Sequence, residues 1–252
     1  MTHVNIDGDI IVYSVGFASE GDPVAFVLSS VNSMIDDIVT ACNADTYSVL
    51  LTGSNNYRQQ TATIAPYKGN RKDSAKPEFY NEIRQHILDN KNGELIEGEE
   101  ADDQLGIRAV RDGAIIATLD KDLDTVPGVH YNWRKQITYT VSETEAMHFF
   151  YTQMLTGDAT DNIPGMFKMV GRRASKKIKE GLLECSTPYE CYRYVYDQYV
   201  EGYEAVGLCL DERDEVVTRW LTEIGQLLYI RQHDGEVWMP PTGEGDGEGR
   251  ED

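Results

Sequence analysis

The sequence predicts an α/β protein: a mostly parallel central sheet covered by helices, with a helical C-terminal lobe. Strand-like and helix-like segments alternate over residues 3–118, which is typical of parallel strands joined by covering helices. Acidic clusters follow several of these segments, and residues just past parallel strands converge on one edge of a sheet. Beyond residue 142 the apolar spacing becomes helical.

Hydrophobic periodicity predicts the elements in order. The sheet region should contain a β-rich segment 3–13, an amphipathic helix 27–42, a short strand 47–52, a helix with Phe79, Ile83 and Ile87 at i, i+4 spacing, a helix 100–111 and a strand 114–118. Ser142 and Glu145 form a capping box that opens a helix through Tyr151. A long helix over 212–232 presents one apolar face, made of Val216, Trp220, Ile224 and Leu227.

Length and charge bound the class of protein. The 252 residues suit one large domain or a domain with an accessory lobe, and 40% hydrophobic residues suffice for a core. The 43 acidic residues outnumber the 23 Lys and Arg, which gives a formal net charge of −20. Taken alone, this charge argues against a nucleic-acid partner, because such affinity comes largely from cations that neutralise phosphates.

The N-terminus has no basic lead-in before an apolar stretch, and no apolar run approaches the roughly 18 residues of a membrane span. We therefore expect a cytoplasmic protein, within the host cell if a phage encodes it, that does not contact membranes. Four cysteines without a C-x-x-C pair predict reduced, buried thiols rather than disulfides or a zinc site; they are Cys42, Cys185, Cys191 and Cys209.

Four acidic groups recur at predicted element boundaries: Asp7-Gly8-Asp9, Glu100-Ala101-Asp102-Asp103, Asp120-Lys121-Asp122 and Asp158-Ala159-Thr160-Asp161. Each alone is explained by a turn or a helix cap. Gathered in one crevice, so many carboxylates stay ionised only with cations between them, and oxygen ligands favour Mg²⁺ or Mn²⁺. A calcium loop after Asp120 is disfavoured, because Thr125 stands where the turn needs Gly and Tyr131 where it needs Glu.

The basic residues are segregated from these acids. Residues 46–72 contain no Asp or Glu and end in Tyr67-Lys68-Gly69-Asn70-Arg71-Lys72, while residues 168–179 hold six cations and no acid. A basic run is often only a solvated helix face. Paired with an acidic metal crevice, the two runs predict a protein that grips a phosphate backbone while holding metals at one phosphodiester.

The second basic run has a recognisable form. Asn162-Ile163-Pro164-Gly165 leads to Gly171-Arg172-Arg173-Ala174 and then to an amphipathic turn with Ile178 and Leu182. This pattern indicates a helix, a glycine-containing hairpin and a second helix. Amides at the start of the second helix would face a phosphate, with Arg172 and Arg173 beside it.

Five blocks, in order over residues 4–182, resemble the 5′-nucleases: phage 5′→3′ exonucleases, flap endonucleases and the 5′-nuclease domain of bacterial DNA polymerase I. The blocks are Ile6-Asp7-Gly8-Asp9, Pro66-Tyr67-Lys68-Gly69-Asn70-Arg71-Lys72, Glu100-Ala101-Asp102-Asp103, Asp120-Lys121-Asp122 with Thr125-Val126-Pro127-Gly128, and residues 157–165. The compact size suggests a stand-alone phage-type enzyme.

The resemblance implies a PIN-like nuclease core over 1–157 with a basic, arch-like segment at about 54–78. A helix-hairpin-helix-type DNA-binding lobe would follow over 158–242, and the Gly- and acid-rich residues 243–252 would form a disordered tail. The chain would act as a monomer.

The resemblance also implies two divalent metals, Mg²⁺ or Mn²⁺, about 4 Å apart as in other two-metal sites. The first would be held by Asp7, Glu100, Asp102 and Asp103, with Asp120 between the two metals. Asp122, Asp158 and Asp161 would hold or orient the second.

DNA-binding residues are implied in the same way. Lys68 and Arg71 would stabilise charge at the scissile phosphate, and Tyr67 would stack on the terminal base. Further contacts would come from Lys72 and from the hairpin residues Lys168, Gly171, Arg172, Arg173, Lys176 and Lys177. The family often binds K⁺ at this hairpin.

Two features depart from the family pattern. An additional Asp usually follows the strand before the basic segment, but here that stretch is Leu50-Leu51-Thr52-Gly53-Ser54; Thr52 or Ser54 could act there through water. The hairpin usually has two glycines one residue apart, whereas this one has Lys168-Met169-Val170-Gly171, which disfavours the K⁺ site.

The leading hypothesis is a metal-dependent 5′→3′ exonuclease of DNA that releases 5′-phosphorylated products. Flap cleavage and RNA-primer removal are related activities, and a replication polymerase or single-strand-binding protein is a conceivable partner. A branched-DNA-binding protein without catalysis is the second hypothesis, but eight retained carboxylates are too costly for an inactive site. An aspartyl phosphotransferase using Asp7 as nucleophile and Asp9 as acid/base is the third, and it leaves the basic hairpin unexplained.

Overall fold

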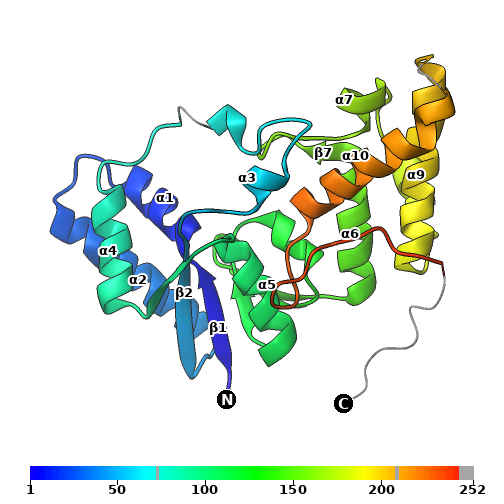
Figure 1. Cartoon of the computed structure of the whole chain (residues 1–252). Coiled ribbons are helices and arrows are strands. Elements are labelled where there is room, and N and C mark those ends of the chain that lie inside the picture. Colours follow the sequence, from blue (N-terminus) through cyan, green and yellow to red (C-terminus); the bar gives the residue numbers. More distant parts are fainter. Residues whose placement is uncertain (72–73, 208–209, 244–252) are drawn as a thin grey trace. The chain divides into compact units, whose positions relative to one another are not determined.

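The computed structural model describes residues 1–71, 74–207 and 210–243 (Figure 1). Contacts divide the chain into two compact units. Unit 1 comprises residues 1–60, 72–146 and 230–236, and unit 2 comprises residues 61–71, 147–229 and 237–252. The expected division at residues 157/158 stays a prediction. The expectations for Lys72, Cys209 and the acidic tail beyond Gly243 fall outside the described residues.

Unit 1 contains a six-stranded sheet in the order β3-β2-β1-β4-β5-β6. Strands β1 to β5 are parallel to one another, and the edge strand β6 is antiparallel to β5. The strands are β1 (His3–Asp7), β2 (Thr46–Thr52), β3 (Gly93–Ile96), β4 (Ile115–Ala117), β5 (Gly128–Asn132) and β6 (Ile137–Val141). The expected mostly parallel central sheet is therefore confirmed.

The β-rich segment expected over residues 3–13 is a strand only as far as Asp7. Helix α1 (Gly8–Ala18) begins at the next residue, because the Asp7 carboxylate caps it by accepting a hydrogen bond from the amide of Ile10. Gly8 is required at this point, since a Cβ there would lie 2.6 Å from the carbonyl oxygen of Leu50 in β2. The apolar residues after Asp7 are thus helical, and they bury Ile11, Val12 and Val15.

Three other helices of the sheet region match the expected periodicity: α2 (Val24–Ala41), α4 (Tyr80–Asn90) and α5 (Ala101–Asp112). The short α3 (Arg58–Thr61) and the 3-10 turn η2 (Lys121–Thr125) were not among the expected elements. By length and mean hydropathy (18 residues, 1.4) α2 could cross a membrane. Its stripe Val27, Val31, Ile35 and Ile38 instead packs into the core of unit 1, and Asp36 and Asp37 lie outside that stripe, as in an amphipathic helix covering a sheet.

Unit 2 is helical apart from a two-stranded ribbon. It contains the 3-10 turn η1 (Gly69–Arg71), most of α6 (Glu143–Thr156), β7 (Gly157–Asp158), β8 (Ile163–Pro164), α7 (Met166–Val170), α8 (Lys176–Leu182), α9 (Pro188–Ala205), η3 (Leu210–Glu212) and α10 (Arg213–Leu228). The capping box of Ser142 and Glu145 at the start of α6 is confirmed by reciprocal hydrogen bonds.

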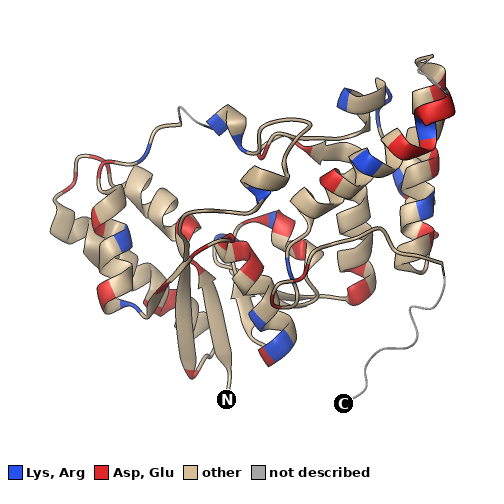
Figure 2. Cartoon of the chain, in the orientation of Figure 1, with Lys and Arg blue, Asp and Glu red and all other residues tan. Residues whose placement is uncertain are grey.

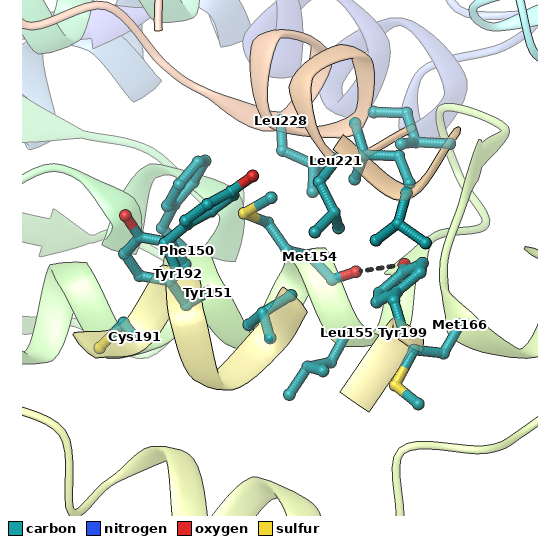
Figure 3. Packing of buried hydrophobic residues seen from close by; sticks show 14 of the residues in the cluster. Phe150, Tyr151, Met154, Leu155, Met166, Cys191, Tyr192, Tyr199, Leu221 and Leu228 are labelled. Atoms are coloured by element: carbon teal, nitrogen blue, oxygen red, sulfur yellow. Dashed lines mark hydrogen bonds between the residues drawn. The ribbon is translucent and has the colours of Figure 1, made fainter. Parts of the chain in front are cut away.

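The buried face of α10 differs in part from the expected one. Ile224 and Leu227 are buried as expected, together with Val217, Leu221 and Leu228, whereas Val216 and Trp220 are only partly buried. The buried stripe packs on α9 and α6 in the core drawn in Figure 3. The helical period and two of the four expected face residues were right, while Val216 and Trp220 pack against the core without being buried in it.

Of the described cysteines, Cys42 and Cys191 are buried as expected, and Cys185 is half-buried. Cys42, Cys185 and Cys191 are free, and burial raises the pKa of Cys42 to about 11 and that of Cys191 to about 12. Such thiols are poor nucleophiles at neutral pH.

Tyr199 ties α9 to the end of α6. The residue is fully buried, and its hydroxyl donates to the carbonyl of Met154 at 2.8 Å, one of the last carbonyls of α6, which have no partner within the helix (Figure 3). Tyr199→Phe should lower the free energy of unfolding by about 1–3 kcal/mol, because a buried carbonyl loses its partner. Tyr196→Phe removes an exposed hydrogen bond to Asp214 and should cost less than about 0.5 kcal/mol. Urea denaturation measures both, and equal losses would contradict the assignment.

Candidate functional site

The carboxyl ends of the central strands β1 and β4 carry two linked aspartates. Asp7 ends β1 and Asp120 follows β4, and Thr118 joins them: its hydroxyl donates to Asp7 at 2.8 Å and accepts from the amide of Asp120 at 3.0 Å. The chain moves from β1 toward β2 and later crosses back to β4, so this is the point where the strand order reverses. Ligands of open α/β sheets bind at such points.

Asp7 lies in an unusual electrostatic environment. Burial, followed by the nearby carboxylate of Asp9, raises its pKa from 3.8 to about 7; Asp120 adds a smaller effect in the same direction. Hydrogen bonds from Ile10 and Thr118 oppose the rise without cancelling it. The negative form of Asp7 is therefore under-compensated by the protein alone, as expected of a carboxylate that takes up a cation.

Asp9 has two partners that sequence reasoning did not identify. Arg84 of α4 donates to Asp9 at 2.9 Å and, through its other terminal nitrogen, to the carbonyl of Thr52 at 2.7 Å. The amide of Thr52 donates to Asp9 at 3.0 Å. Asp9 therefore brings a carboxylate to the carboxyl end of β2, where the strand itself has none.

The missing carboxylate after β2 has a structural cause. A Cβ at Gly53 would lie 2.6 Å from the carbonyl oxygen of Ile96 and 2.7 Å from the carboxylate of Glu97. Glu97 in turn accepts hydrogen bonds from the amide and hydroxyl of Ser54. The backbone at residue 53 leaves no room for an aspartate, and Thr52 serves instead as an acceptor for the amide of Ala101 at 3.0 Å.

That hydrogen bond places the start of α5, with Glu100, Asp102 and Asp103, beside the end of β2. Asp103 is fully buried and forms a two-pronged ion pair with Arg58, at 2.6 and 2.8 Å. Glu100 lies 3.7 Å from the same guanidinium, and its amide donates to Asp103 in a capping box. Arg58 is 2% exposed, so a buried cation of the protein itself compensates the charge of Asp103 and Glu100, two of the expected metal ligands.

The segment after α10 returns to unit 1 and closes this cluster. The amide of Arg231 donates to Asp103 at 3.1 Å, and its guanidinium pairs with Glu99 at 2.7 Å. The ring of Tyr57 lies between two guanidinium groups, 4.8 Å from that of Arg58 and 4.0 Å from that of Arg231. These contacts fix the backbone that carries Glu100 and Asp102.

The donors at this edge fit a hard divalent cation in their chemistry. Carboxylate oxygens suit Mg²⁺ or Mn²⁺, and no Lys or Arg in the described part of the chain pairs with Asp7. Over residues 1–71, 74–207 and 210–243, however, no three His, Cys, Asp or Glu side chains are gathered into a group that could hold a metal ion. Mutual repulsion, the turn of Asp103 toward Arg58 and that of Asp9 toward Arg84 account for this spread.

Asp122 belongs to unit 1, where its amide donates to Asp120 at 2.9 Å. Asp158 and Asp161, expected to act with it, belong to unit 2. Asp158 accepts from the amides of Thr160 and Asp161, which shapes their loop. Asp161 is bound by the basic segment: the hydroxyl of Tyr67 donates at 2.9 Å, Arg71 lies at 3.0 Å and Lys68 at 3.6 Å.

Tyr67 does not have the environment expected of a base-stacking residue. Its ring is 9% exposed and packs in the core of unit 2, with the ammonium of Lys68 5.1 Å from the ring centre. In this conformation Tyr67 offers no open face to a nucleobase, because its hydroxyl is tied to Asp161 and its ring to the core.

The hairpin lies between α7 and α8. Gly171 is left-handed (φ 68°) and ends α7, and Ser175 caps α8. Lys168, Arg173, Lys176 and Lys177 are exposed, as expected for DNA contacts, while Arg172 pairs with Glu201 at 2.6 Å and Arg173 stacks on Phe167 at 4.8 Å. The cations of the hairpin therefore point mostly to solvent, and Figure 2 shows Lys and Arg in blue at α7.

Solved structures of phage nucleases share this fold. The D15 protein of bacteriophage T5, crystallised with metal ions, aligns with 91% of this chain and 100% of its own (TM-score 0.55, 16% identity). The T5 5′-exonuclease with bound zinc covers 88% and 99% (TM-score 0.54, 19% identity). A variant of the T5 D15 flap endonuclease, in a pseudo-enzyme-product complex with DNA and metal ions, covers 90% and 100% (TM-score 0.51, 17% identity). No protein-family model and no curated protein sequence matches the chain. The chain thus has the fold of the phage 5′-exonucleases.

Sequence reasoning missed the residues that balance the acids: Arg58, Arg84, Arg231 and, for the basic segment, Glu223. Glu223 of α10 is buried and accepts from the amides of Thr63 and Ile64, at 2.7 Å each. The one available signal was that Arg58 lies in the acid-free window 46–72, which was assigned to DNA rather than to an internal carboxylate.

Arg58→Met should destabilise the protein by about 3–5 kcal/mol, because it leaves Asp103 buried without its cation. Arg108→Met provides a matched control, since Arg108 forms a similar two-pronged pair with the more exposed Glu94 and should cost no more than about 1 kcal/mol. Chemical denaturation of both variants measures the difference. A cost for Arg58→Met no larger than that of its control would contradict the role of the buried pair.

The raised pKa of Asp7 predicts a pH-dependent stability. A proton binds folded Asp7 more tightly than unfolded Asp7, so the free energy of unfolding should fall as pH rises from about 4 to about 7 and then level off. About 1.4 kcal/mol per pH unit sets an upper limit of about 4 kcal/mol. In EDTA, Asp7→Asn should lack this fall, and Asp36→Asn should retain it. Mg²⁺ should flatten the wild-type profile if a cation binds beside Asp7. Parallel profiles for wild type and Asp7→Asn would contradict the assignment.

Proposed function

We propose that the protein is a metal-dependent 5′→3′ exonuclease that hydrolyses DNA phosphodiesters and leaves 5′-phosphate products. The observation that carries this proposal is the pair Asp7 and Asp120, linked through Thr118 at the strand-order reversal, in a chain with the fold of the phage 5′-exonucleases. A dinucleotide-type cofactor would need phosphate-binding amides at this point, whereas here the carboxylates of Asp7 and Asp120 are found.

Mg²⁺ or Mn²⁺ suits these donors, and when bound such ions activate the attacking water and stabilise the leaving oxygen. We assign Asp7, Glu100, Asp102 and Asp120 to holding a first ion. Asp122, Asp158 and Asp161 are assigned to a second. Asp103 is assigned to positioning, because both of its oxygens accept from Arg58 and its carboxylate caps the helix that carries the ligands.

The chain's own cations bind and orient the substrate in this proposal. Lys68 and Arg71 contact the scissile phosphate and balance the charge that develops there. The exposed hairpin cations grip duplex DNA through its phosphates; they are Lys168, Arg173, Lys176 and Lys177, with Arg172 behind them. Flap cleavage and RNA-primer removal are included as related activities of the same site.

Digestion of 5′-labelled duplex and flap DNA tests the reaction. Mg²⁺ should support release of 5′-phosphorylated products and EDTA should abolish it. Asp158→Asn should lower the rate by about 100-fold or more, since metal ligands contribute several kcal/mol to the transition state. Asp197→Asn, an exposed change on α9 of the same charge, is the control and should be nearly neutral. A wild-type protein that binds forked DNA with Mg²⁺ and cuts nothing would instead support a branched-DNA-binding protein.

Lys68 should act on the reaction more than on binding. Lys68→Ala is expected to lower the single-turnover rate by about 100-fold, the usual effect of losing one transition-state donor, and to weaken DNA affinity by less than about tenfold. Lys177→Ala removes an exposed hairpin cation and should lose more affinity than rate. Equal losses of rate and affinity in Lys68→Ala would make Lys68 a simple phosphate contact.

A further inference from the structure

Three donors from the basic segment converge on one carboxylate, that of Asp161. Tyr67 donates its hydroxyl to one carboxylate oxygen, Arg71 contacts the other oxygen, and the ammonium of Lys68 completes the set, at 2.9, 3.0 and 3.6 Å. Guanidinium, ammonium and hydroxyl donors around a pair of anionic oxygens are also what proteins use to bind a phosphate. The three donors thus form an anion site whose present occupant is Asp161.

Backbone contacts hold the basic segment at this position. The amide of Lys68 donates to the carbonyl of Asp161 at 2.9 Å, and Lys68 has a left-handed φ of 52°, which a lysine rarely adopts without support. Side chains on both loops add three more hydrogen bonds: Asn70 to the Ala159 carbonyl, Arg71 to the Thr160 carbonyl and Asn162 to the Pro66 carbonyl. The loops 66–71 and 158–162 are therefore docked as one piece.

The anion site is accessible to an incoming ligand. The side chains of Lys68 and Arg71 are 32% and 42% exposed, whereas that of Asp161 is 18% exposed. A DNA phosphate could reach both cations from solvent, but it would then lie beside the carboxylate that they already neutralise. Two anions cannot share these cations without mutual repulsion, so Asp161 and a phosphate compete.

We propose that Asp161 is an internal competitor of DNA: in the free protein it occupies the site of Tyr67, Lys68 and Arg71, and a phosphate of the substrate displaces it. The proposal rests on the nuclease function proposed above and deepens it. Binding of a phosphate releases the Asp161 carboxylate from the three donors. Without substrate, the carboxylate of Asp161 and the cations Lys68 and Arg71 neutralise each other's charge.

Asp158 supplies a matched control. It lies in the same loop and carries the same charge, but its oxygens accept from the amides of Thr160 and Asp161 and not from the basic segment. Any change in DNA affinity that follows merely from removing one negative charge from this loop should be the same for Asp158→Asn and Asp161→Asn. Only the second variant empties the anion site.

The test is binding of a 5′-phosphorylated duplex oligonucleotide, measured by fluorescence anisotropy in EDTA over a range of KCl concentrations. Asp161→Asn should bind about 3- to 10-fold more tightly than Asp158→Asn at low salt. Its plot of log affinity against log salt should be steeper by about 0.9 for each added phosphate contact, up to two contacts for Lys68 and Arg71. Adding Lys68→Ala and Arg71→Ala to Asp161→Asn should remove this gain.

Tyr67→Phe keeps the proposal testable should Asp161→Asn fold poorly. It removes one donor to Asp161 without changing any charge, loosens the carboxylate and should tighten DNA binding about twofold in EDTA. Equal affinities and parallel salt plots for Asp161→Asn and Asp158→Asn would overturn the proposal, as would weaker binding by Tyr67→Phe. If wild type and all variants fail to bind DNA at any salt concentration, both this proposal and the nuclease function fail. If they bind and Mg²⁺ yields no cleavage, only the nuclease function fails.

Discussion

Repulsion between carboxylates is the constraint on which the rest of the structure depends. The chain places acids at the carboxyl ends of β1 and β4, at the start of α5 and in the loop after β7. Like charges at close range stay ionised only when cations or donors face them. The protein meets this requirement from within, in three separate places: Arg58 on Asp103, Arg84 on Asp9, and Lys68 with Arg71 on Asp161.

The net charge of −20 is unevenly distributed along the chain. The last ten residues contribute −4, from five acids and one Arg, and the eight carboxylates assigned to the site contribute −8. The remaining −8 is spread over the rest of the chain. The acidity that seemed to exclude a nucleic-acid partner is largely concentrated in a candidate metal site and a tail. Five of the exposed cations lie together on the α7–α8 hairpin: Lys168, Arg173, Lys176, Lys177 and Lys179.

The sequence predicted what depends on local pattern. Apolar periodicity located β2, α2, α4 and α5 to within a few residues, and the Ser142 capping box located the start of α6. It did not separate strand from helix at residues 8–13, because an apolar run of that length fits either one and the cap formed by Asp7 decides between them. Trp220 was wrongly placed in the buried face of α10 for a related reason, since a half-buried Trp resembles a core residue in sequence.

The site was predicted less completely, because its balance depends on contacts between distant residues. Arg58 and Asp103 are 45 positions apart, and Arg231 reaches the same carboxylate from 128 positions away. Sequence reasoning read the acids as ligands and the bases as DNA contacts, which is the simplest assignment when no pairing is visible. It could not show that Asp103 has its own buried cation, or that Gly53 has no room for the carboxylate its position resembles.

Burial separates the two kinds of internal cation that the structure contains. The side chain of Arg58 is 2% exposed and its partner Asp103 is fully buried, so a ligand from solvent cannot replace Asp103 in this ion pair. The pair therefore stabilises the fold. Lys68 and Arg71 are about a third exposed or more, and their pair with Asp161 can exchange for a phosphate. The pair of Arg84 and Asp9 is intermediate between these two cases: the side chain of Arg84 is 16% exposed and that of Asp9 is 30% exposed. A site built from repelling acids can thus be stable before any metal or DNA arrives, provided that some of its cations are permanent and others are exchangeable. The exposed fraction of each cation then distinguishes carboxylates that hold the fold from carboxylates that remain available for chemistry.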